Sequence, residues 1–130
     1  MQLSSPAWLR RLPAGAVILV LFAATAGAAD IEAGKTVFNR CKACHHLEQG
    51  GSTALGPNLH GVLGRKAGTL SGYNYSEAMK GSGIIWDEDT LAKYLRDPKS
   101  FMPGNKMAFP GIKNGTELAN LLAYLKQATQ

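Results

Sequence analysis

Cys41-Lys42-Ala43-Cys44-His45 is the stretch of this 130-residue chain that decides its fold. Two cysteines separated by two residues and followed at once by a histidine have the spacing at which a c-type haem is attached to protein. In that chemistry two thiols add across the vinyl groups of the porphyrin, and the adjacent imidazole is placed to bind the iron. The motif therefore predicts one covalent haem c on Cys41 and Cys44, with His45 as an iron ligand.

Three other uses of these residues are chemically conceivable. A disulfide would close so short a loop that it would stabilise the chain little. A thioredoxin-like redox pair needs a surrounding βαβ pattern, which this sequence lacks. A zinc site is chemically possible with Cys41, Cys44 and two of His45, His46 and His60. Structural zinc modules usually repeat the cysteine pair or add a spaced histidine pair downstream, so the zinc module remains only an alternative.

The N-terminus has the pattern of an export signal. A pair of arginines is followed by the uncharged, apolar residues 14–24 and then by small residues that fit a signal peptidase site. We expect a signal peptide over residues 1–29, cleaved after Ala28 or Ala29. The alternative is an uncleaved anchor, because residues 12–29 carry no charge and are marginally long enough to span a bilayer.

The remaining residues, 30–130, have the length of one domain. The chain has fourteen basic residues, two of them in the signal, and nine acidic residues, all after residue 29, which leaves a formal charge of +3. The lysines are scattered, with none of the arginine-rich stripes of a nucleic-acid-binding protein. This composition argues against nucleic acid as a partner.

Helical patterns occur at both ends of this domain. Asp30 is a suitable N-cap for a helix running toward the cysteine motif. A second helix is expected between Asp87, which can cap it, and Pro98, which stops it. Asn114 and Glu117 have the spacing of a capping box before a C-terminal helix, whose leucines recur at intervals of three and four.

Between these helices the chain is rich in glycine. Residues 50–72 contain seven glycines and no strand-like alternation. An irregular stretch of that length normally argues against a compact domain. A bound haem resolves the conflict, since small chains often need a prosthetic group to complete their core. We therefore predict an all-α fold, with three main helices and long loops wrapped around one haem.

The whole of residues 30–130 resembles a class I c-type cytochrome, of the bacterial type most similar to mitochondrial cytochrome c. The matching segments occur in the order and spacing of the family's short members. They are residues 34–38, 41–45, 56–61, 64–66, 83–86, 90–95, 103–107 and 121–129.

The resemblance implies the second iron ligand. In the family, the methionine of a Pro-Gly-x-Lys-Met segment binds the iron opposite the histidine, and here that residue is Met107. From chemistry alone, a thioether is a suitable soft ligand, and Met79, Met102 and Met107 are all available. Met102 is the nearest rival because it lies in the same segment.

The resemblance also implies haem contacts for six further residues. Pro57 matches a proline whose carbonyl accepts the ring N–H of the ligating histidine. The residues that match those hydrogen-bonded to the propionates are Arg65, Tyr75 and Trp86. Tyr94 is expected near the methionine sulfur, and Phe109 beside the haem edge. The chain departs from the family at Met79, where an asparagine is usual, and at Asn105, where a threonine commonly bonds a propionate.

Two axial ligands leave the iron no open position, which predicts a one-electron carrier and not an enzyme. His/Met ligation favours ferrous iron and raises the reduction potential. With the export signal, this predicts a soluble monomer in the periplasm, and the expected partners are a membrane quinol–cytochrome c oxidoreductase as donor and a terminal oxidase or photosynthetic reaction centre as acceptor. The resemblance also implies a docking ring of five cations: Lys35, Arg40, Lys99, Lys106 and Lys113. A five-coordinate haem protein that binds gas or reduces peroxide is the alternative.

Overall fold

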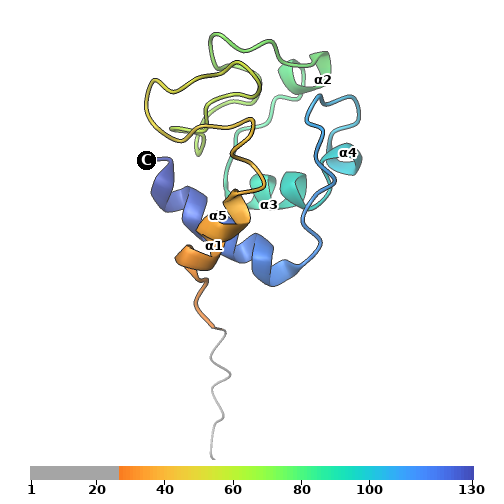
Figure 1. The fold of residues 1–130 in the computed structure, drawn as a ribbon. Coiled ribbons are helices and arrows are strands. Elements are labelled where there is room, and N and C mark those ends of the chain that lie inside the picture. Colours follow the sequence, from red (N-terminus) through yellow and green to blue (C-terminus); the bar gives the residue numbers. More distant parts are fainter. Residues whose placement is uncertain (1–26) are drawn as a thin grey trace, which may run out of the picture.

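The computed structural model describes residues 27–130, which form helices joined by long loops (Figure 1). Within this range no strand forms, and the only sheet-like pairing is an isolated bridge between Lys66 and Ile85. The predicted all-α class is confirmed. The helices are α1 (Ile31–Phe38), α2 (Glu77–Lys80), α3 (Glu88–Arg96), α4 (Pro98–Phe101) and α5 (Gly115–Ala128).

The predicted export signal lies almost entirely outside the described residues, and only its last three positions fall within them. Over residues 27–130, none of the helices has the length and apolarity needed to cross a bilayer.

The three predicted N-caps are confirmed. The Asp30 side chain accepts a hydrogen bond from the backbone N–H of Ala33, which begins α1. Asp87 accepts the N–H of Thr90, and the Thr90 hydroxyl accepts the Asp87 N–H in return, so α3 begins with a reciprocal capping box. Asn114 accepts from two backbone N–H groups at the start of α5.

Two features of the helices were not predicted. Glu117 does not complete a capping box with Asn114, because its carboxylate instead forms a two-point ion pair with Arg40 at 3.0 and 3.1 Å. The helices α2 and α4 are only four residues long, too short to show a helical period in the sequence. Asp97 ends α3 and also caps α4 through the N–H of Ser100.

The N-terminal and C-terminal helices, α1 and α5, pack closely across each other (Figure 1). Gly34 makes this approach possible: a Cβ atom placed there would lie 2.0 Å from the carbonyl oxygen of Asn120 in α5. Beside the crossing point, the rings of Phe38 and Tyr124 have centroids 5.7 Å apart. The Asn120 side chain also accepts the backbone N–H of Asp30 at 2.8 Å, which ties the start of α1 to the middle of α5.

Over residues 27–130, buried apolar side chains form two clusters, and Leu59, Leu95 and Leu122 pack against both. The first lies between α1 and α5 and is centred on Phe38 and the fully buried Leu121. The second surrounds α3 and contains Trp86, Tyr94 and Met102. A cavity lined by residues of both clusters lies between them.

Candidate haem-binding site

The cavity between the two clusters has a volume of about 300 Å³ and a mainly apolar lining. That is the size of a ligand site, since such pockets measure ~300–1,000 Å³. Interiors of folded proteins are otherwise close-packed. A cavity of this size therefore indicates a place for a large apolar group.

The cysteine motif reaches the cavity through a continuation of α1. The backbone N–H groups of Cys44 and His45 both donate to the carbonyl of Cys41, so the motif forms a helical turn. Residues at positions i, i+3 and i+4 of such a turn share a face. This local geometry accounts for the two-residue gap and the adjacent histidine: Cys41, Cys44 and His45 all line the cavity, and both cysteines are free thiols.

The His45 ring is oriented by the following loop. Its Nδ1 lies 2.7 Å from the carbonyl oxygen of Pro57, the contact that the resemblance implies. This bond leaves Nε2 as the nitrogen free to bind a metal. Gly56 permits the close approach, because a Cβ there would lie 3.0 Å from His45 Cε1. Burial lowers the pKa of His45 and favours the neutral imidazole that a metal requires.

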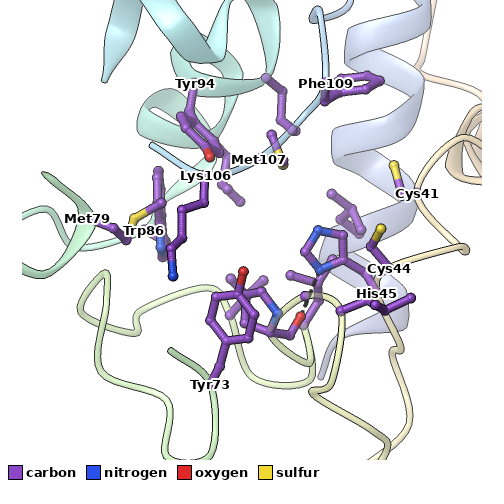
Figure 2. Close-up of a pocket in the computed structure, with 18 of the residues that line it drawn as sticks. Cys41, Cys44, His45, Tyr73, Met79, Trp86, Tyr94, Lys106, Met107 and Phe109 are labelled. Carbon is purple, nitrogen blue, oxygen red and sulfur yellow. Dashed lines mark hydrogen bonds between the residues drawn. The ribbon is translucent and has the colours of Figure 1, made fainter. Parts of the chain in front are cut away.

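Of the three candidate methionines, two line the cavity. Met107 enters it from the segment after α4, and Met79 lies at the end nearer Trp86 (Figure 2). Met102, the rival in the same segment, is only 5 % exposed, belongs to the second cluster and is not among the cavity-lining residues. Figure 2 shows Met107 and Tyr94 on one side of the cavity and His45 with the cysteines on another.

The residues expected to hold propionates gather at one part of the lining. Arg65, Tyr75 and Trp86 all line the cavity. The Arg65 guanidinium donates to the carbonyls of Asn58 at 2.9 Å and His60 at 3.3 Å, which fixes its direction. Burial lowers the pKa of Arg65 and raises that of Tyr75, so this polar group is partly withdrawn from water.

The remaining expected contacts also reach the cavity. Tyr94 and Phe109 both line it, and burial raises the pKa of Tyr94 to about 12. Of the two departures from the family pattern, Met79 lines the cavity and Asn105 does not.

Sequence reasoning did not assign several of the lining residues to the site, and Leu55 and Tyr73 are two of them. Leu55 is 73 % exposed although it is apolar. The Tyr73 hydroxyl points toward the cavity, and its ring packs edge-on against Tyr75 at a centroid distance of 4.8 Å (Figure 2). Both lie in the glycine-rich loops, where no periodic pattern assigns side chains to one face, so no signal in the sequence identifies them.

Three of the five predicted docking cations have intramolecular partners. Arg40 pairs with Glu117, Lys106 donates to a loop carbonyl at 2.7 Å, and Lys113 donates to the Arg96 carbonyl. Lys35 on α1 and Lys99 on α4 are exposed. Within the described part of the chain, no ion pair involves either of them.

The zinc alternative finds no support in this geometry. Among residues 27–130, no three side chains of His, Cys, Asp or Glu come together as a metal site. His46 and His60 do not line the cavity. The soft and nitrogen donors that do line it are two thiols, one imidazole and the thioethers of Met79 and Met107, a set that fits a covalently attached haem.

Fold and site together define a small helical haem protein of the c type. Comparison with known proteins agrees: residues 31–129 match the family described as "Cytochrome c". The chain belongs to the cytochrome c family, an electron-transfer class whose members carry one covalent haem c. The resemblance seen in the sequence is thereby confirmed, as is the predicted cofactor.

Individual relatives support this assignment over most of the described chain. Cytochrome c-550 of Bradyrhizobium diazoefficiens is 54 % identical over 95 residues, which are 73 % of this chain and 70 % of that protein. Cytochrome c2 of Blastochloris viridis is 42 % identical over 119 residues, 92 % of this chain and 94 % of that one. The structure of cytochrome cH from Methylobacterium extorquens superposes with a TM-score of 0.71 at 45 % identity, covering 76 % and 99 % of the two chains.

Proposed function

We propose that this protein is a periplasmic one-electron carrier whose haem is attached through Cys41 and Cys44 and ligated by His45 and Met107. The observation that carries the proposal is that an imidazole and a thioether, sixty-two residues apart in the chain, line one cavity together with both motif cysteines (Figure 2). When bound, the cofactor supplies an iron that alternates between two oxidation states. The chain has the task of holding the iron's surroundings constant between them.

Several residues serve that task. The bond from His45 Nδ1–H to the Pro57 carbonyl fixes the ring and raises the basicity of Nε2. The apolar lining, which includes Phe109, Tyr94 and Trp86, keeps water from the iron and so favours the less charged ferrous state. Arg65, which lines the cavity, would supply a positive charge for the acidic groups of a bound haem.

Docking is proposed to use the cations Lys35, Arg40, Lys99, Lys106 and Lys113. A positive surface around the cofactor's edge suits brief, electrostatically steered encounters with acidic partners. The proposed partners are a membrane quinol–cytochrome c oxidoreductase and either a terminal oxidase or a photosynthetic reaction centre. Relatives named cytochrome c-550 and cytochrome c2 support a bacterial carrier. We further propose that residues 1–29 are removed on export and that residues 30–130 act as a monomer.

Spectroscopy of the purified holoprotein tests the ligand set. We expect the ferric form to show the weak far-red sulfur-to-iron band at neutral pH. Met107→Ala should abolish the band, and Met79→Ala and Met102→Ala should keep it. Loss of the band in Met79→Ala alone would reassign the ligand. Absence of the band from the wild type, together with ready binding of carbon monoxide to the ferrous form, would establish the five-coordinate alternative.

Two further measurements test the remaining parts. Mass spectrometry of the exported protein should give an N-terminus at Ala29 or Asp30, and an N-terminus at Met1 or Gln2 would establish an uncleaved signal. Transfer rates to an acidic redox partner should fall as ionic strength rises. A rate independent of salt would remove the docking ring from the proposal.

A further inference from the structure

The Asn105 side chain makes its hydrogen bonds within the protein chain and does not itself line the cavity. It lies two residues before Met107, in the segment that we call the Met107 loop (residues 102–107). The chain has asparagine here where the resemblance leads one to expect a threonine that bonds a propionate. Yet Asn105 does not line the cavity. Its amide points into the loop itself.

Every hydrogen-bonding position of this amide has a partner. The Nδ2 group donates to the carbonyls of Pro98 and Met102, both at 2.9 Å. The Oδ1 atom accepts the backbone N–H of Met107 at 2.9 Å and, more weakly at 3.4 Å, the hydroxyl of Tyr94. A primary amide has two donors and one oxygen with two lone pairs. All four are used within the chain, and none is left for the cofactor.

These partners connect both ends of the Met107 loop to the protein's interior. Pro98 is a buried residue of α4, and Met102 is buried in the second cluster. Tyr94 lies on α3 and is 6 % exposed. The amide thus links the backbone of the proposed ligand to α4, to the base of the loop and to α3. Partial burial of Asn105 makes each of these bonds costly to leave unmade.

We propose that Asn105 is a positioning residue that clamps the Met107 loop and so holds the methionine on the iron, rather than a residue that binds the cofactor. This inference rests on the proposed function, in which Met107 is the ligand. Its consequence concerns loop opening, because an external ligand can reach the iron only when Met107 leaves it. Removing the clamp should favour the open state.

The test is imidazole binding to the ferric holoprotein, followed spectroscopically at neutral pH. Losing two or three hydrogen bonds of ordinary net strength corresponds to roughly a 10- to 100-fold shift in an equilibrium. We therefore expect Asn105→Ala to raise the association constant for imidazole by about that factor and to weaken the far-red band. Asn105→Asp keeps the volume but loses both donors to Pro98 and Met102, so it should also raise the constant, and it serves if the alanine variant does not accumulate.

Asn114→Ala is the matched control. It is the same substitution, and it also removes hydrogen bonds to backbone, those to the N–H groups of Thr116 and Glu117 at the start of α5. It should lower the denaturant midpoint without changing imidazole affinity. An equal rise in affinity in Asn114→Ala would show that general destabilisation is sufficient, and would overturn the clamp.

Two other results separate the proposals. If the wild type has the far-red band, Met107→Ala removes it, and neither Asn105 variant changes the band or the imidazole constant, the ligand assignment stands and the clamp is refuted. If the wild type lacks the band and Met107→Ala leaves its spectrum unchanged, the ligand assignment is overturned and the clamp with it.

Discussion

The contact between α1 and α5 depends on a missing side chain, and Gly34→Ala tests it. An added Cβ would lie 2.0 Å from the carbonyl oxygen of Asn120, 2.6 Å from its carbonyl carbon and 2.8 Å from Tyr124 Cβ. The nearest of these atoms belong to helix backbone and cannot rotate away. Restoring even a 3.0 Å contact would require the helices to separate by about 1 Å, since overpacked interiors relieve strain through backbone shifts.

The energetic effect combines two opposing contributions. Overpacking a well-packed core costs about 1–3 kcal/mol, and a clash with backbone belongs at the upper end. Alanine is favoured over glycine in a helix by ~1 kcal/mol, which offsets part of this cost. We expect a net loss of about 2 kcal/mol in the free energy of unfolding. Separation of the helices would also loosen the packing around Leu121, which is fully buried.

Guanidinium chloride unfolding of the holoprotein, followed by far-ultraviolet circular dichroism, measures this loss. Gly115→Ala is the matched control, because it is also a helical glycine but a Cβ there meets no atom within 4 Å. That control should leave stability unchanged or raise it by up to ~1 kcal/mol. If Gly34→Ala stays within about 0.5 kcal/mol of wild type, as ordinary surface substitutions do, close helix contact does not limit stability and the reasoning is refuted.

Three other predictions concern ionisable groups. Burial raises the pKa of Tyr94 to about 12, so the phenol ionises first in the unfolded chain as pH rises above about 10. The free energy of unfolding should therefore fall by up to ~3 kcal/mol by pH 12. Tyr94→Phe should remove that fall when unfolding is measured as a function of pH. The hydrogen bond from the Thr90 backbone N–H lowers the pKa of Asp87. The contribution of the Asp87 carboxylate to stability should therefore disappear as pH falls below 3.8. Asp87→Asn still caps α3 and should lack this pH dependence. A double-mutant cycle on the half-exposed pair of Arg40 and Glu117 should give a coupling of ~1 kcal/mol or less that decreases with salt.

The helices that could be predicted are those encoded locally. Asp30, Asp87 and Asn114 act on backbone groups two or three residues away, so the sequence contains everything that the caps require. The capping box expected at Glu117 was wrong because its carboxylate pairs with Arg40, seventy-seven residues away, and a local pattern cannot register that competition. Short helices such as α4 depend on a single cap and show no periodicity.

The candidate haem site also has parts that the local sequence determines and parts that only tertiary structure determines. The cysteine motif is predictable because Cys41 and His45 share one helical turn. Chemistry alone does not choose among the methionines, since the thioethers at positions 79, 102 and 107 are equivalent. The family resemblance is what points to Met107, and only tertiary packing buries Met102 away from the cavity. Asn105 illustrates the limit most clearly. Family position suggests a cofactor contact, whereas its four hydrogen bonds join segments that only the folded loop brings together.

The cavity volume explains why a chain with such long loops has a defined fold. Residual cavities destabilise proteins by ~24 cal/mol per Å³. This cavity is partly open to solvent, so applying that figure to 300 Å³ gives an upper limit of ~7 kcal/mol, comparable to the whole net stability of ~5–15 kcal/mol typical of a native domain. A bound haem would therefore act as the missing centre of the core, in the cavity that residues of both clusters line. Redox function and stability then depend on the same contacts, so a residue that fixes the Met107 loop contributes to both.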